Sequence, residues 1–406
     1  MKFIPTCLAL LFAGTLVAVE STRQWTSSDG KSIEGTIKGL DGDLLKLETE
    51  RGVFEVPLSR FSNEDQQFAR EWVKNAASMA AGKTEGGTAG NTAPALGNFE
   101  DLEVGVWPQY VTAELEVDQI EEIKTDGEND YIYRTPHFEF QAPDRLSNSV
   151  VREFARIFEA TYNFVDQMPI GLAPKPSANG YYVTKLYMTR GDYFADGGVE
   201  GSAGMFSWRQ RGNEMSGIIK VPLSNLGVEY TGTRFIVDHN KRSTTLTHEI
   251  THQVMMRWFA TPIPIWLSEG LAEVVSSQDY DNGRFKLNSM DRSIADEVTR
   301  GQGRDFRMVG AEKLMTISRE EWSNEMSSGM GGGNYNSANV LAYYFLKLDG
   351  NGDGANLVEY LKTLTSGDQE AAKVSQEEFL LRGRSYEALE KDIADAWRSE
   401  GLKIEF

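Results

Sequence analysis

The chain has 406 residues, of which 60 are acidic and 41 basic, so its formal net charge is −19. This excess of negative charge argues against nucleic acid as the principal partner, because phosphate binding depends on concentrated Lys and Arg. It favours solubility instead. The length allows two or three domains and a substantial hydrophobic core.

Residues 1–20 predict a signal peptide. Lys2 precedes an apolar run, Cys7–Val19, that is too short for a confident membrane span, and an uncleaved anchor is the alternative. We therefore expect a secreted or periplasmic protein with no stable membrane span after cleavage. Because Cys7 is the single cysteine, the mature chain would lack disulfides, and a zinc site would need nitrogen and oxygen ligands.

Residues 21–75 predict a small all-β barrel. Strand-sized apolar runs are separated by turns at Asp29-Gly30, Asp41-Gly42 and Arg51-Gly52. A short helix is expected to begin at Ser62-Asn63-Glu64-Asp65. The apolar residues expected inside the barrel are Trp25, Ile33, Ile37, Leu45, Leu47, Phe54, Val56 and Leu58.

This segment resembles the SH3-like first Sla homology module. The matching residues are Arg23-Gln24-Trp25-Thr26, Val56-Pro57-Leu58 and Phe61-Ser62-Asn63-Glu64-Asp65. The resemblance implies a binding role with a peptide as the candidate ligand, and a purely structural or tethering role is the alternative. An exported version need not keep a cytoskeletal or endocytic partner. No ligand-binding residue is assigned.

Residues 76–97 predict a flexible linker, because Ala, Gly and Thr dominate and the hydrophobic periodicity is lost. Residues 98–406 follow as the second domain. Its mixed order of strands and helices predicts the α+β class. The expected elements before the next motif are strands at Tyr110–Val117 and Tyr131–Phe140, a helix over Val150–Met168, a strand at Tyr181–Met188 and a hairpin at Met205–Val221.

His248-Glu249-Ile250-Thr251-His252 contains two of the chain's four histidines. On a helix, residues four apart lie one turn apart on the same face, so both imidazoles can bind one metal ion. Glu249, on the adjoining face, can take a proton from a metal-bound water as that water attacks a carbonyl. A buried stripe of Leu246, Ile250, Val254 and Trp258 favours the helix.

A third ligand is expected downstream, because catalytic zinc usually has three protein ligands and an open position. Ile265–Glu273 predicts a second helix, which a short loop can return to the histidine pair. We expect Glu269 to be the ligand and Glu273 to accept the free ring N–H of a ligating histidine. On these grounds the roles of the two glutamates are interchangeable. Glu273 could also be an exposed helix carboxylate with no role in the site. If the HExxH motif stood alone, an ordinary amphipathic helix with exposed histidines would explain it.

These residues resemble the gluzincin metallopeptidases, whose pattern is HExxH followed on a second helix by W-L-x-E-G. His248, Glu249 and His252 match the first part, and Trp266-Leu267-x-Glu269-Gly270 matches the second. The resemblance implies a gluzincin-like α+β domain with zinc ligands His248, His252 and Glu269, and Glu249 as the base. Within gluzincins the chain is similar to bacterial peptidase-MA-like domains, with Thr135-Pro136-His137-Phe138-Glu139-Phe140 near their start.

The same resemblance implies two further roles. Part of Met205–Val221 would be a sheet edge that holds an extended peptide, although core strands are the alternative. Tyr335, before the expected helical run Ala338–Leu348, would donate to the developing oxyanion, with a packing or surface tyrosine as the alternative.

Two other features are expected to lie outside the catalytic chemistry. His239, in the loop before the zinc helix, is predicted to be structural or exposed. Asp349–Gly354 imitates the start of a calcium-binding EF-hand loop, but Tyr360 replaces the expected Glu, so a glycine-rich turn is predicted.

The predicted function is therefore an exported zinc metallopeptidase that hydrolyses bonds in a peptide or protein substrate. The alternative is an adaptor whose second domain keeps a zinc-containing peptidase fold but binds peptides without turnover.

Overall fold

The computed structural model describes residues 22–27, 31–41, 44–49, 52–62, 65–66, 69, 102–126, 131–172, 174–176, 179–198, 202–211, 214–238, 245–300, 303–327 and 332–406. The predicted signal peptide, the predicted linker and His239 lie outside these residues. The chain divides into two compact units, Met1–Glu85 and Gly86–Phe406. Helices and strands together form the larger unit, in agreement with the α+β class.

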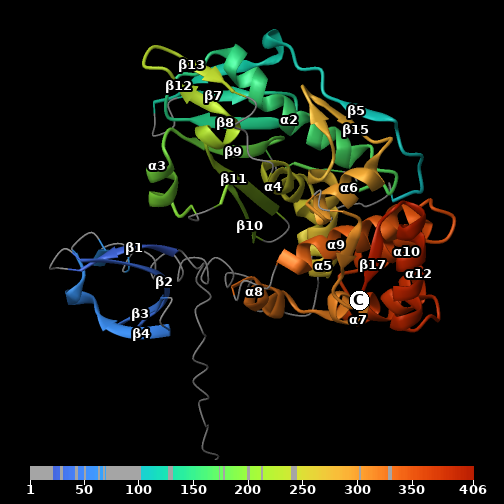
Figure 1. Ribbon diagram of the computed structural model, residues 1–406. Coiled ribbons are helices and arrows are strands. Elements are labelled where there is room, and N and C mark those ends of the chain that lie inside the picture. The colour runs from blue at the N-terminus through green and yellow to red at the C-terminus, as the bar shows by residue number, and fades with distance from the viewer. Residues whose placement is uncertain are drawn as a thin grey trace, which may run out of the picture. The chain divides into compact units, whose positions relative to one another are not determined.

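The smaller unit contains a four-stranded antiparallel sheet whose strands follow one another in chain order (Figure 1). An isolated antiparallel bridge joins Ser27 to Phe61. The helix predicted after Ser62 is helical at the positions described there, Asp65, Gln66 and Ala69. The strands are β1 (Thr22–Thr26), β2 (Ser32–Asp41), β3 (Leu44–Thr49) and β4 (Gly52–Pro57), followed by the 3-10 helix η1 (Leu58–Arg60).

The core of this unit is small, and its described buried apolar residues are Trp25, Leu45, Leu47, Leu58, Phe61 and Ala69. Two interior predictions are wrong: Ile33 and Phe54 are 45% and 44% exposed. Ile33 lies directly opposite the buried Trp25, and Phe54 lies directly opposite the buried Leu47. A core of this size does not cover the whole sheet face, as expected for a small module. Val56 is partly buried, and the side chain of Ile37 lies outside the described part.

The larger unit contains a mixed six-stranded sheet in the order β10-β11-β9-β8-β7-β6. β9 is parallel to both β8 and β11, and the other neighbouring pairs are antiparallel. β10 is therefore an edge strand among the described strands. The bounds are β6 (Glu121–Lys124), β7 (Tyr131–Arg134), β8 (Phe138–Ala142), β9 (Tyr182–Tyr187), β10 (Met205–Arg211) and β11 (Glu214–Pro222).

Two strand predictions need correction. Tyr131–Phe140 forms two antiparallel strands, β7 and β8, rather than one, because the turn at Pro136 interrupts it. Of Tyr110–Val117 only β5 (Tyr110–Thr112) is a strand, since its partner β15 (Arg284–Lys286) pairs with those three residues alone.

Helix α2 (Asn148–Asp166) connects β8 to the parallel strand β9 and packs on the sheet (Figure 1). The Ser147 side chain accepts a hydrogen bond from the Val150 N–H and caps the helix start. Edge-to-face ring contacts join helix to sheet, with centroids 5.0 Å apart for Phe140 and Phe158 and 5.3 Å apart for Phe138 and Phe158. The helix predicted over Val150–Met168 is therefore present, but it begins at Asn148 and ends at Asp166, two residues earlier at each end.

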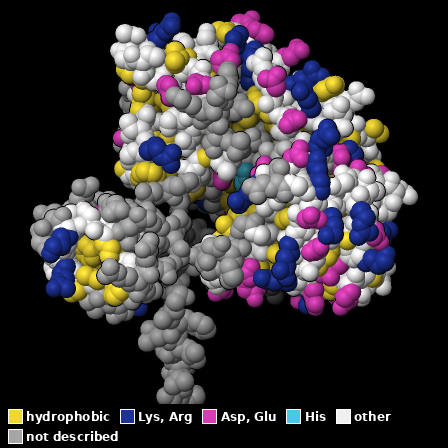
Figure 2. All heavy atoms as spheres, in the orientation of Figure 1, with side chains coloured by type: hydrophobic (Ala, Val, Ile, Leu, Met, Phe, Trp, Pro, Cys, Tyr) yellow, Lys and Arg dark blue, Asp and Glu magenta, His cyan; other side chains and the backbone are white. Residues whose placement is uncertain are grey.

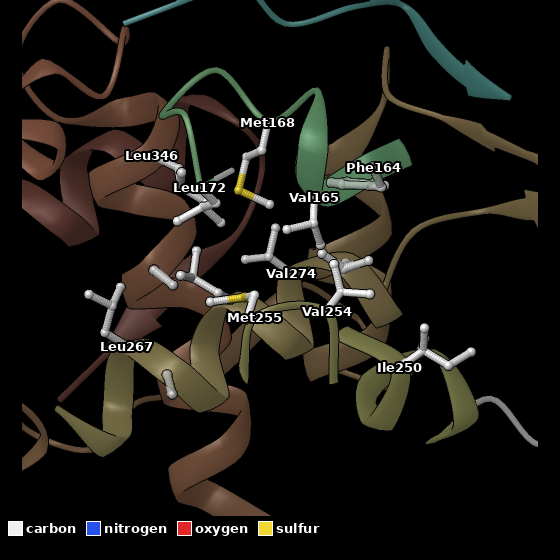
Figure 3. Packing of buried hydrophobic residues seen from close by; sticks show 14 of the residues in the cluster. Phe164, Val165, Met168, Leu172, Ile250, Val254, Met255, Leu267, Val274 and Leu346 are labelled. Carbon is white, nitrogen blue, oxygen red and sulfur yellow. The ribbon is translucent and has the colours of Figure 1, made fainter. Parts of the chain in front are cut away.

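Helices α4 (Thr245–Val254) and α5 (Ile265–Ser276) lie between the sheet and the C-terminal helices (Figure 1). The predicted stripe from Leu246 to Trp258 is buried, but α4 ends at Val254 and the chain continues as the 3-10 helix η5 (Met256–Ala260). Side chains of α2, α4 and α5 meet in one hydrophobic cluster, which Figure 3 shows around Val165, Val254 and Val274.

Close contact between α5 and α9 (Gly332–Tyr343) depends on Gly270. A Cβ atom at this position would lie 2.4 Å from the carbonyl oxygen of Ala338 and 2.8 Å from the Ala342 Cβ. Because these distances are far below van der Waals contact, glycine is required for the observed helix separation. This gives a structural reason for the glycine in W-L-x-E-G.

The turn predicted at Asp349–Gly354 lies between the π-helix η6 (Tyr344–Leu348) and α10 (Ala355–Leu364). Its first carboxylate, that of Asp349, is buried and accepts hydrogen bonds from Arg382, Arg384 and Asn356. These bonds attach the turn to the C-terminal helices.

The remaining elements complete the larger unit, and none of the described helices is long and apolar enough to cross a membrane. They are η2 (Val117–Gln119), α3 (Arg190–Ala195), η3 (Leu223–Leu226), β12 (Val228–Tyr230), β13 (Phe235–Val237), β14 (Tyr280–Asp281), α6 (Met290–Val298), β16 (Asp305–Arg307), α7 (Ala311–Thr316), α8 (Arg319–Ser327), the π-helix η6 (Tyr344–Leu348), α10 (Ala355–Leu364), α11 (Gln369–Ser375), the π-helix η7 (Gln376–Leu381), α12 (Tyr386–Ser399) and β17 (Lys403–Glu405).

Candidate metal centre

The three predicted ligands meet at one point. His252 Nε2 lies 2.9 Å from His248 Nε2 and 3.1 Å from Glu269 Oε2, and His248 Nε2 lies 3.3 Å from the same oxygen. Ligand atoms about 2.0–2.1 Å from a tetrahedral metal lie roughly 3.3 Å from one another. Two imidazole nitrogens and one carboxylate oxygen are donors typical of catalytic zinc, whereas Mg²⁺ and Ca²⁺ favour oxygen alone. These side chains therefore fit zinc.

Helix geometry and one short connection bring the ligands together. The two histidines lie one turn apart on α4, and η5 followed by Pro262 and Pro264 reverses the chain. α5 then begins at Ile265 and packs against α4, so Glu269 faces the histidine pair. Figure 2 shows a histidine side chain in a hollow on the surface of the larger unit.

Glu273 contacts the other side of the first histidine. Its Oε1 lies 2.9 Å from His248 Nδ1. Among the described residues His248 Nδ1 makes no hydrogen bond, so this approach is an ion-pair contact. It orients the ring with Nε2 toward Glu269. The geometry thereby distinguishes the two carboxylates, whose roles the sequence left interchangeable.

The contacts among these side chains favour a protonated His248 and an ionised Glu269. Burial alone would lower the pKa of His248, but contacts with Glu269 and Glu273 and their negative charges raise it well above its usual value. Burial would raise the pKa of the Glu269 carboxyl, but the charge of His252 and contacts with both histidines hold it far below its usual value.

Glu249 connects α4 to the edge of the sheet. Its Oε2 accepts a hydrogen bond from the backbone N–H of Phe206 on β10, at 2.9 Å. Because the outward-facing amides of an edge strand have no strand partner, the Glu249 carboxylate satisfies one of them. The predicted base is therefore held beside the histidines and at the free edge of β10.

Tyr335 lies against the first histidine. Its ring centroid is 5.8 Å from that of His248 and 5.3 Å from that of Trp322. Burial raises the pKa of Tyr335, and the charge of Glu269 raises it further, so its hydroxyl stays protonated near neutral pH. The expected helical run begins earlier than predicted, at Gly332, and Tyr335 lies inside α9.

Several neighbours of the site were not predicted as functional residues. Phe259 lies on the other side of the pair, with its ring centroid 5.7 Å from that of His252, and Trp322 covers Tyr335. Arg319, at the start of α8, lies over Phe259. Only Phe206 and Trp208 could have been grouped from the sequence, because side chains two residues apart in a strand lie on the same face.

No protein-family model matches the chain, and a search of curated proteins finds no match.

Proposed function

We propose that the larger unit is a gluzincin-like zinc peptidase that hydrolyses peptide bonds in a peptide or protein substrate. The observation that carries this proposal is the convergence of His248, His252 and Glu269, with Glu249 held between α4 and the edge strand β10. The three ligands by themselves would be equally compatible with a structural zinc site. A carboxylate beside them that is not a ligand provides the base that hydrolysis requires.

Each residue has a separate role in this proposal. Zinc held by His248, His252 and Glu269 would supply a Lewis acid that polarises the scissile carbonyl and lowers the pKa of water toward 7. Glu249 accepts a proton from that water and delivers it to the leaving amine. Glu273 orients His248, and the protonated hydroxyl of Tyr335 donates to the developing oxyanion.

The smaller unit is proposed to be an SH3-like binding module of an exported protein. Its support is a four-stranded antiparallel sheet around Trp25, whose indole N–H donates to the carbonyl of Gly35 at 2.9 Å. A peptide is the ligand class that we propose, and the larger unit contains the whole proposed catalytic site.

Cleavage of a broad peptide library by the zinc-loaded mature protein tests the proposal. Tyr335→Phe removes the hydroxyl and keeps the ring, so we expect turnover to fall by about 100-fold or more with zinc content unchanged. Tyr343→Phe, a buried tyrosine of the same helix that lies against Trp397, is the matched control. Folded, zinc-loaded protein that cleaves no peptide would leave the peptide-binding adaptor as the function.

A further inference from the structure

The free edge of β10 continues from the catalytic base toward an exposed tryptophan. The backbone N–H of Phe206 points away from β11, because it donates to Glu249. Backbone groups in a strand alternate direction with a period of two, so those of Trp208 also point toward the free edge. An extended chain that pairs with this edge would therefore reach both the proposed base and Trp208.

Trp208 and Phe259 form an aromatic surface beside the metal centre. Their rings are stacked, with centroids 5.6 Å apart and planes inclined by 13°, and Trp208 is 39% exposed. Phe206 supports this surface by lying across Gly217, where a Cβ atom would be 2.6 Å from its ring. Because Phe259 also contacts His252, the aromatic surface adjoins the proposed ligands.

Arg319 places a positive charge at the same position. Its Cζ lies 5.9 Å from the centroid of Phe259, and Nη2 donates to the carbonyl of Ile263 at 3.2 Å. Among the residues that the structure describes, no carboxylate lies within ion-pair distance of it. Most of its five N–H donors are thus left for a ligand.

The backbone around Arg319 is held in place by a reciprocal cap. Ser318 Oγ accepts a hydrogen bond from the Glu321 N–H, and Glu321 Oε2 accepts one from the Ser318 N–H at 2.9 Å. Arg319 is the first residue of the helix that this cap begins. A defined backbone therefore carries the Arg319 side chain.

We propose that Arg319, Phe259 and Trp208 form a recognition site for substrates that carry a carboxylate next to an aromatic or large apolar side chain. This inference rests on the proposed peptidase function and names its substrate class. The planar guanidinium binds the carboxylate in a bidentate manner, and the stacked rings cover the apolar side chain. The carboxylate is either the C-terminus of a short peptide or an Asp or Glu side chain.

Binding to full-length mature Glu249→Gln protein, loaded with zinc, tests this without turnover. Calorimetry compares acetyl-Ala-Ala-Phe-Ala as the free acid and as the amide, and acetyl-Ala-Ala-Phe-Glu-amide with its Gln counterpart. We expect at least one carboxylate peptide to bind about 10- to 100-fold more tightly than its neutral partner. Preference for the free acid identifies the terminal carboxylate, and preference for Glu identifies the side chain.

Two substitutions assign the preference to the proposed residues. Arg319→Gln should make the charged and neutral peptides bind equally, whereas Arg209→Gln, an exposed arginine on the opposite face of β10, should leave the preference intact. Trp208→Ala should weaken binding of the Phe peptides but not of peptides with Ala in that place. Zinc content and the melting temperature verify that each variant is folded.

The inference is overturned if neither carboxylate peptide is preferred, or if the preference survives in folded Arg319→Gln protein. The experiment can reject the recognition site and the peptidase function independently of each other. Wild-type protein that cleaves none of these peptides, while the Arg319-dependent preference persists, would retain the recognition site and remove the hydrolysis.

Discussion

The backbone N–H of Phe206 donates to the carboxylate of Glu249 at 2.9 Å, and this bond links the edge of the sheet to the HExxH helix. The proposed base and the strand edge where a peptide would pair are therefore parts of one surface. A substrate strand on β10 would lie beside the carboxylate that must accept the proton. Geometry that brings base and substrate together in this way contributes to catalysis by orientation.

The two carboxylates of α5 should differ in their effects on zinc. Glu269→Gln should weaken zinc binding more than Glu273→Gln, because Glu269 faces both Nε2 atoms whereas Glu273 contacts only His248 Nδ1. Loss of an outer partner such as Glu273 typically costs about 10- to 100-fold in metal affinity. Competition with a chromogenic chelator measures both constants, and Glu320→Gln, an exposed position on α8, is the control. The reverse order would make Glu273 the ligand.

Gly270→Ala should destabilise the larger unit and weaken its zinc site. The new methyl would lie 2.4 Å from the Ala338 carbonyl oxygen, so α5 and α9 must separate, and Glu269 is the adjacent residue. We expect a loss of about 1–3 kcal/mol or more in the free energy of unfolding, measured by urea denaturation, together with a lower zinc affinity.

Gly333→Ala provides the matched control on α9. A Cβ there meets only Val309, at 4.0 Å, so the substitution should be neutral or stabilise the helix by up to about 1 kcal/mol. Equal stability of wild type and Gly270→Ala would show that the two helices do not need their close contact.

Features of the site that depend on residues close together in the sequence could be predicted, whereas contacts between distant segments could not. His248 and His252 follow from helical spacing, and a carboxylate ligand on the helix after the Pro262–Pro264 break follows from its place in the chain. The choice of Glu269 over Glu273 was left open by position and agrees with the W-L-x-E-G resemblance. The Phe206 bond to Glu249 could not be predicted, since the partner of a backbone N–H depends on how the sheet edge meets α4. The same holds for Phe259 beside His252, which results from tertiary packing.

Tertiary contacts also explain two errors in the predicted elements. α9 begins at Gly332, although glycine disfavours helix, because contact with α5 stabilises the segment beyond its local propensity. Ile33 has the alternation of an interior strand residue, yet the core of the smaller unit does not reach it. Periodicity predicts which face a residue occupies but not how far the core extends.

Glu159 should be important for stability although it lies outside the metal centre. This buried carboxylate accepts hydrogen bonds from the Thr135 hydroxyl at 2.6 Å and the His137 N–H at 3.0 Å, and lies 2.6 Å from His137 Nδ1. Glu159→Ala would leave these groups without their partner, and we expect a loss of about 3 kcal/mol in unfolding free energy. Glu153→Ala, on the same helix but in a partly exposed ion pair with the neighbouring Arg152, should cost less than about 1 kcal/mol. Comparable losses in both would contradict this assignment.

The stabilising contribution of Asp196 should disappear in acid. Burial would raise its pKa, but hydrogen bonds from Tyr187, Lys185 and Lys220 lower it from 3.8 to about 2. A lowered carboxyl pKa stabilises the folded state above the unfolded pKa, and this contribution is lost as the pH falls from about 4 to about 2. The stability difference between wild type and Asp196→Asn, from urea unfolding, should therefore shrink across that interval. A difference that is constant from pH 6 to pH 2 would contradict the shift.

Zinc content and peptide turnover, measured on the same samples of mature wild-type and Glu249→Gln protein, test the central claim most directly. Glu249 is a proposed base and not a ligand, so both proteins should contain close to one zinc per chain, while turnover in the variant falls by about 100-fold or more. Wild-type protein that binds no zinc after reconstitution, or a Glu249→Gln variant with full turnover, would contradict the account.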